Sequence, residues 1–146
     1  MHRRCEATPL TDSISLTWRG AFTSREANLL HADAFETRIF ADEEWDWCDQ
    51  VNNHSLGWVT ARSRETLVGF VNVISDGFVH AWIQDVMVAP SAQRGGIGVA
   101  LVHAARDAAT EAGCEWLRVD FDDEHSRFYI DSCGLEPARA GLMDLT

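Results

Sequence analysis

The stretch WIQDVMVAPSAQRGGIGVALVHAARDAATEA, residues 82–112, predicts a strand, a short loop and a long helix in succession. Residues 82–88 are rich in apolar and β-branched side chains, and Pro90 ends the strand because proline cannot donate to a sheet ladder. From Ile97 onward, apolar residues recur with the period of an α-helix. Gly113 then stands where a glycine in the left-handed conformation commonly ends a helix.

The loop between this strand and helix has the composition of a phosphate-binding turn. Gly95, Gly96 and Gly98 expose backbone N–H groups at the positive end of the helix dipole. A P-loop is excluded because no Gly-Lys-Ser/Thr is present and the chain contains no lysine. A dinucleotide-binding loop fits poorly because Leu101 stands where its third glycine is needed.

Length and charge limit the classes of protein to consider. A chain of 146 residues predicts one domain spanning 1–146. The formal charge of -11 excludes nucleic acid as the expected partner, because phosphate binding needs basic surface. Acidic residues cluster at 42–49 and 120–124. These clusters are either solvated surface or the entrance of a binding site that attracts a cationic amine.

Cysteine spacing and hydropathy predict a cytoplasmic protein without a metal site or a membrane partner. The four cysteines form no Cys-x-x-Cys pair, and the histidines are scattered. The sequence shows neither a secretory signal nor an apolar run of membrane-spanning length.

The remaining pattern predicts an α/β (α+β) domain. A loose leader over 1–12 precedes a strand at 13–19, a helix from the Thr23–Glu26 capping box to about 35 or 36, and a short helix near 44–51. Strands at 58–62, 67–74 and 78–88 are joined by turns, and a strand at 116–121 runs parallel to the last of these. A final helix begins at Asp122 or Asp123 and is closed by Gly134, and residues 135–146 supply one or two strands.

Two motifs resemble those of one family. Gln93-Arg94-Gly95-Gly96-Ile97-Gly98 resembles the Gln/Arg-x-x-Gly-x-Gly/Ala signature of the GNAT superfamily, the acetyl-CoA-dependent N-acyltransferases. The run from Arg127 to Leu135 resembles its Phe-Tyr-x-x-x-Gly-Phe element, with leucine in the last place. The resemblance covers about 57–137. It implies a mixed, mostly antiparallel sheet with a parallel strand pair splayed at the cofactor cleft and helices on both faces.

The resemblance also implies acetyl-CoA as cofactor and a set of contacts to it. Val86, Met87 and Val88 would pair with the pantetheine amides, and the amide of Val86 or Met87 would stabilise an oxyanion. The pyrophosphate would be wrapped by Gln93, Arg94, Gly95, Gly96, Ile97, Gly98 and Val99. Asp122 and Arg127 would contribute from the start of the final helix, although asparagine is common in the family at the position of Asp122.

The resemblance implies two candidate catalytic groups, Tyr129 and Asp85. Tyr129 falls at the general-acid position of the family, and a phenol stays protonated at neutral pH. Asp85 is the candidate base, and strand alternation predicts that Gln84 points to the opposite face. A satisfied structural carboxylate is an equally good interpretation of Asp85, with His80 and His54 as alternative bases.

The six tryptophans are open to two interpretations. Trp45, Trp47, Trp58 and Trp82 could line a cation-binding pocket or belong to the core. Trp18 and Trp116 alternate along strands and are expected in the core.

The resemblance therefore predicts an N-acetyltransferase that transfers the acetyl group directly to a primary amine. The acceptor could be a small molecule or a peptide or protein amine, and a homodimer is possible. An acyl-CoA-binding domain without catalysis and an interaction protein with a merely tight glycine turn are the alternatives.

Overall fold

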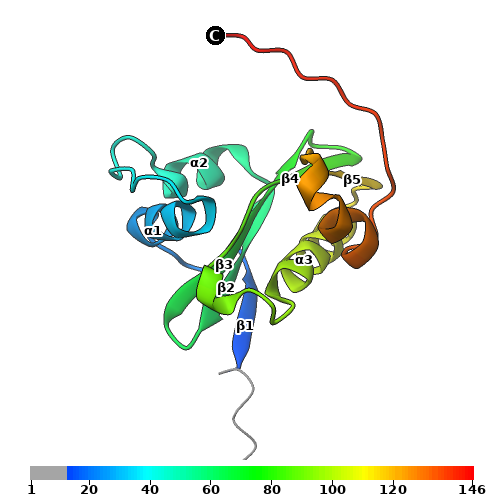
Figure 1. The fold of residues 1–146 in the computed structure, drawn as a ribbon. Coiled ribbons are helices and arrows are strands. Elements are labelled where there is room, and N and C mark those ends of the chain that lie inside the picture. The colour runs from blue at the N-terminus through cyan, green and yellow to red at the C-terminus, as the bar shows by residue number, and fades with distance from the viewer. Residues whose placement is uncertain (1–12) are drawn as a thin grey trace, which may run out of the picture.

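A five-stranded sheet in the order β1-β2-β3-β4-β5 lies at the centre of the computed structural model, which describes residues 13–146 (Figure 1). The first four strands are antiparallel neighbours, and β5 runs parallel to β4. The strands are β1 Ile14–Trp18, β2 Gly57–Ser63, β3 Thr66–Ser75, β4 His80–Val88 and β5 Trp116–Arg118. The predicted mixed sheet is confirmed, whereas the leader predicted over 1–12 lies outside the described residues.

Helices cover both faces of this sheet, as predicted (Figure 1). On one side lie α1, Ser24–Phe35, and α2, Trp47–His54; on the other lies α3, Ile97–Glu111. Three shorter helical segments are η1, Pro90–Ala92, η2, Asp123–His125, and η3, Arg127–Ser132. Because both faces are covered, residues 67–73 of β3 are all buried, as expected for a central strand.

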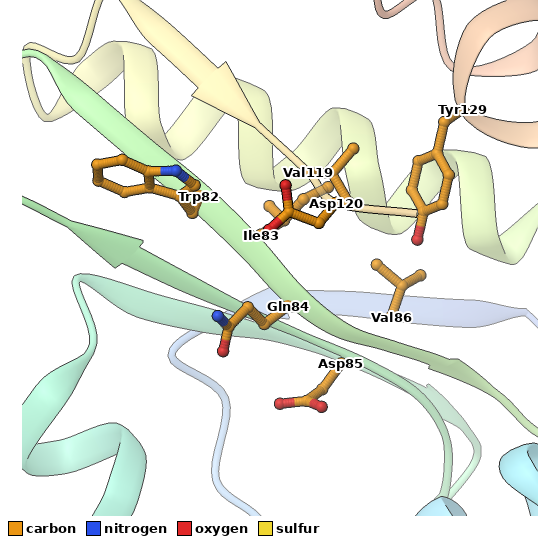
Figure 2. Close-up of a pocket in the computed structure, with 8 residues that line it drawn as sticks. All are labelled: Trp82, Ile83, Gln84, Asp85, Val86, Val119, Asp120 and Tyr129. Carbon is orange, nitrogen blue, oxygen red and sulfur yellow. The ribbon is translucent and has the colours of Figure 1, made fainter. Parts of the chain in front are cut away.

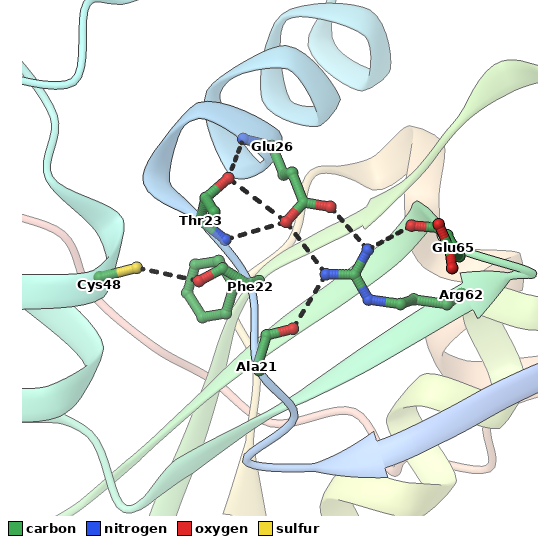
Figure 3. A network of polar contacts seen from close by, with 7 residues as sticks. All are labelled: Ala21, Phe22, Thr23, Glu26, Cys48, Arg62 and Glu65. Atoms are coloured by element: carbon green, nitrogen blue, oxygen red, sulfur yellow. Dashed lines mark hydrogen bonds and ion pairs between the residues drawn. The ribbon is translucent and has the colours of Figure 1, made fainter.

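Local capping explains where the first two helices begin. Thr23 and Glu26 form the predicted capping box: the Thr23 hydroxyl accepts from the Glu26 amide, and the Glu26 carboxylate accepts from the Thr23 amide (Figure 3). α2 begins at Trp47 rather than at the predicted Glu44, because the Asp46 carboxylate caps it by accepting from the Asp49 amide.

The tryptophans expected in the core as strand residues are not in it. Trp116 is 61% exposed and Trp18 is 36% exposed, because β1 and β5 are the edge strands of the sheet. Trp47 and Trp58, in contrast, are buried in the main core.

The C-terminal part of the chain differs most from prediction. β5 ends at Arg118 rather than at 121, because it pairs only with His80–Trp82 of β4. The final helix is a 3₁₀ turn followed by the π-helical η3, in which the Cys133 amide donates to the Phe128 carbonyl. The strands predicted within 135–146 are wrong: this segment has no regular structure, and Leu142 is 99% exposed because no strand pairs with the segment.

None of the helices within residues 13–146 is long and apolar enough to cross a membrane.

Candidate active site

The site is built around a β-bulge in β4. Phe70 pairs with Met87 and Asn72 pairs with Gln84, so both Asp85 and Val86 lie opposite Val71. Asp85 has a φ of 55°, a left-handed conformation that is uncommon for residues other than glycine. The bulge therefore turns Asp85 out of the regular alternation of the strand.

Beyond the bulge, β4 and β5 separate. Their pairing involves only His80–Trp82 and Trp116–Arg118, so the later part of β4 has no partner strand on this side. Its backbone N–H and C=O groups can therefore pair with an extended ligand. Two cavities lie beside this opening.

The larger cavity has a volume of about 780 Å³ and extends from the glycine loop to the bulge. Most of the residues predicted to bind the cofactor line it: Val86, Val88, Gln93, Arg94, Gly96, Ile97, Gly98, Val99 and Asp122. Met87, Gly95 and Arg127 do not line it. The Met87 side chain is buried in the core, and Arg127 is exposed.

The glycine loop has the geometry of a phosphate cradle. Gly96 caps α3 with a φ of 77°, and the first helical bond joins the Ala100 amide to the Gly96 carbonyl. The N–H groups of residues 97–99 therefore have no acceptor within the helix and favour an anion. A Cβ atom at Gly98 would lie 3.0 Å from the Phe128 ring, so any larger residue here requires that ring to shift. These features fit the pyrophosphate of acetyl-CoA.

The smaller cavity, whose lining residues are drawn in Figure 2, has a volume of about 290 Å³. It is lined by Trp82, Ile83, Gln84, Asp85, Val86, Val119, Asp120 and Tyr129. Asp85, Val86, Asp120 and Tyr129 line both cavities. The two candidate catalytic groups therefore lie where the cavities meet.

Tyr129 reaches this junction from η3. Its hydroxyl points toward Val86 on the opposite side of the opening (Figure 2). The rings of Phe121 and Phe128 pack against it, with centroids 5.0 Å and 4.8 Å away. Burial, together with the nearby Cys133, raises the pKa of Tyr129 to about 12, so the phenol is protonated at neutral pH.

Asp85 and Gln84 both line the smaller cavity, and their side chains lie on the same side of β4 (Figure 2). The prediction that they point to opposite faces is wrong, because the bulge interrupts the alternation. Within residues 13–146 the Asp85 carboxylate has neither a hydrogen-bond nor an ion-pair partner, which argues against a satisfied structural carboxylate. Burial raises the pKa of Asp85.

The alternative bases lie elsewhere. His54 is exposed at the end of α2, and His80 lies on β4; neither lines the larger or the smaller cavity. The part of the chain that the structure describes contains no group of three or more His, Cys, Asp or Glu side chains that could hold a metal ion.

The four tryptophans considered as pocket residues lie in different environments. Of the four tryptophans proposed for a pocket, Trp82 lines one. Trp47 and Trp58 are buried, and Trp45 stacks on Trp47 at 4.5 Å.

The acidic run 42–49 is largely structural. Asp42 accepts from Asn28, Glu44 pairs with Arg38, and Asp46 caps α2. In the second acidic run, by contrast, Asp120 and Asp122 line cavities.

Sequence reasoning missed several lining residues. Ala34 and Phe35 of α1 line the larger cavity, together with Phe121 and Phe128. Both residues lie in the last turn of α1, and Phe35 is 49% exposed. The position of Phe128 beside Tyr129 in the second motif was the one available signal.

The family of the chain follows from a comparison with family models. Residues 22–135 match the model described as the acetyltransferase (GNAT) family. The chain belongs to this family. It is therefore an acyltransferase of the GNAT fold, and its cofactor is acetyl-CoA. No curated protein matches the sequence significantly.

Solved structures show the same fold at low sequence identity. A GNAT-family acetyltransferase from Streptococcus pneumoniae is 23% identical, with a TM-score of 0.71 and coverage of 92% of this chain and 98% of that one. Glucosamine-6-phosphate N-acetyltransferase from Arabidopsis thaliana is 16% identical, with a TM-score of 0.70 over 89% of this chain and 97% of that one. AAC(6')-Iy, in complex with the bisubstrate analogue CoA-S-monomethyl-acetylneamine, is 14% identical, with a TM-score of 0.73 over 92% and 98% of the two chains.

Proposed function

We propose that this GNAT domain transfers the acetyl group of acetyl-CoA to a primary amine by direct attack of the amine on the thioester. The observation that carries the proposal is the meeting of Asp85, Val86 and Tyr129 where the two cavities join. A base, a backbone donor and an acid are therefore available at one point. The cysteines of the described chain do not line either cavity, which supports transfer without an acyl-cysteine step.

Acetyl-CoA would supply an activated acetyl thioester at this junction. The free N–H groups at the start of α3 would hold the pyrophosphate, and the unpaired edge of β4 from Val86 to Val88 would pair with pantetheine. An amide N–H at Val86 or Met87 would stabilise the negative charge that develops on the acetyl oxygen.

Two side chains would move protons. An alkylammonium must lose a proton before it attacks, and Asp85 would accept that proton directly or through water. Burial raises the pKa of Asp85 and so makes it a better base than an ordinary carboxylate. Tyr129 would donate its phenol proton to the departing thiolate.

A cytoplasmic location and a homodimer remain predictions from the sequence and from the family resemblance.

The test combines binding with turnover. We expect isothermal titration calorimetry to show acetyl-CoA binding, and an amine panel to release CoA thiol. The Tyr129→Phe variant should bind acetyl-CoA as the parent does and lose roughly 10²–10⁴-fold in kcat, the usual scale for removal of a general acid. Binding without thiol release in either form would favour the non-catalytic acyl-CoA-binding alternative.

A further inference from the structure

We infer that the acceptor is an unbranched aliphatic amine with a second positive charge, as in a diamine or polyamine. The inference rests on the proposed function and names the substrate class of the same site. It is carried by the charges that line the two cavities and by the room in the smaller one.

The two cavities differ in the basic side chains that line them. In the described chain the smaller cavity is lined by two carboxylates, Asp85 and Asp120, and by no arginine or histidine. Arg94 and His125 line the larger cavity, where they belong to the glycine loop and to η2. Asp85 and Asp120 line the larger cavity as well, together with Asp122, so carboxylates line both cavities whereas arginine and histidine line only the larger one.

Of the two carboxylates that line the smaller cavity, only Asp85 is assigned to proton transfer. Asp85 would take the proton of the amine that reacts, and that amine becomes neutral. The Asp120 carboxylate has no cationic partner among the side chains of residues 13–146. A second ammonium on the acceptor would supply that partner, whereas a carboxylate or phosphate would be repelled.

Two further features agree with an aliphatic cation. The indole of Trp82 lines the same cavity and can bind an alkylammonium by a cation–π contact. The volume of about 290 Å³ corresponds to roughly ten water molecules in the liquid. A short methylene chain with an ammonium group at each end fits within this volume.

The acidic run 42–49 does not account for such a preference. Asp42, Glu44 and Asp46 already make the structural contacts described above. We therefore assign recognition of the second charge to Asp120.

The test uses three amines with similar aliphatic chains and different distal groups: putrescine, butylamine and γ-aminobutyrate. Their kcat/KM values are measured by CoA thiol release from acetyl-CoA. We expect putrescine to exceed butylamine by about tenfold or more after correction for its two equivalent amines, and γ-aminobutyrate to be slowest. Added salt should reduce this preference.

Two variants test whether Asp120 causes the preference for putrescine over butylamine. Asp120→Asn should lower the ratio of the putrescine to the butylamine value to within about twofold, because the partner of the distal ammonium is removed. Asp123→Asn is the matched control: Asp123 is a nearby exposed carboxylate that lines neither cavity, and its variant should keep the parental ratio.

The possible failures can be told apart. Equal or better use of γ-aminobutyrate would overturn the inference and leave the proposed acetyl transfer intact. An unchanged ratio in Asp120→Asn would overturn the role of Asp120. Acetyl-CoA binding with no thiol release for any amine would overturn the proposed function, and this inference with it.

Discussion

At the scale of single residues, the backbone of Asp85 explains how one strand presents two neighbouring side chains to one cavity. Its left-handed φ of 55° costs energy for a residue with a Cβ atom, and such conformations cluster at functional sites. Asparagine and aspartate tolerate this region better than β-branched residues do. A substitution at position 85 can therefore remove the carboxylate while it keeps the left-handed backbone, or it can disturb both.

Asp85→Asn should lower kcat by roughly 10²–10⁴-fold, because the amide cannot accept the proton of the amine, while the fold is kept. Asp85→Val should in addition destabilise the protein by roughly 1–2 kcal/mol relative to Asp85→Asn, because valine disfavours a positive φ. Thiol release measures the first effect and urea unfolding the second. Full turnover by the asparagine variant would show that Asp85 is not the base.

At the scale of elements, α1 is fixed to the sheet at its N-terminus. The Arg62 guanidinium of β2 donates to the Glu26 carboxylate at 2.6 Å, to the Ala21 carbonyl at 2.9 Å and to the Glu65 carbonyl at 2.7 Å (Figure 3). This pair keeps the pKa of Glu26 low. Because Phe35 at the other end of α1 lines the larger cavity, the contact also positions one wall of the site.

Glu26→Ala should lower the free energy of unfolding by about 1–3 kcal/mol, since it removes both the capping box and a partly buried charged partner of Arg62. Glu44→Ala is the comparison: this carboxylate pairs with Arg38 at the surface and accepts from the Ala41 amide, so we expect a smaller change in the unfolding midpoint. Denaturant unfolding of both variants checks the comparison. Equal effects would mean that the Arg62 contact adds nothing beyond a surface pair.

Elements with local signals could be predicted from the sequence, and elements that depend on distant partners could not. The capping box at Thr23 and the glycine loop are encoded within a few residues, and both were found where expected. The length of β5 depends on how far β4 runs beside it, and strands within 135–146 would need a partner that the described chain does not provide. The bulge changes the pairing register of β4, and no glycine or proline in the strand signals it. The alternation rule for a regular strand therefore could not predict that Gln84 and Asp85 lie on the same side.

At the scale of the whole molecule, His31 couples stability to pH. Its ring is buried against the rings of Phe35, Phe40, Trp45 and Trp47, with centroids between 4.8 Å and 5.8 Å away. Its Nδ1 has no hydrogen-bond partner in the described structure. Burial lowers the pKa of His31 below 6.5 in the folded state.

The unfolded chain should therefore bind the His31 proton more readily as the pH falls below 6.5. The stability that the neutral, buried His31 ring contributes to the folded state is fully present above pH 6.5. It is lost as the pH falls toward the folded-state pKa of His31. Asp85 acts in the opposite direction, since burial raises its pKa.

His31→Gln should reduce the loss of unfolding free energy between about pH 7.5 and 5.5, measured by urea titration at each pH. His54→Gln, at an exposed position on α2, should leave the loss unchanged. A parental pH dependence in His31→Gln would assign the effect to other groups.

The bulge in β4 also bears on how such a domain can change over evolutionary time. A bulge is set by the number of residues in a strand, so loss of one codon at Asp85 would place Val86 alone opposite Val71 and restore an ordinary ladder. Single-base substitutions leave that number intact. Under the proposed function, substitutions at Gln84, Trp82 and Asp120 would alter acceptor preference while Asp85 and Tyr129 keep their places. An in-frame deletion at the bulge would instead remove activity toward every acceptor.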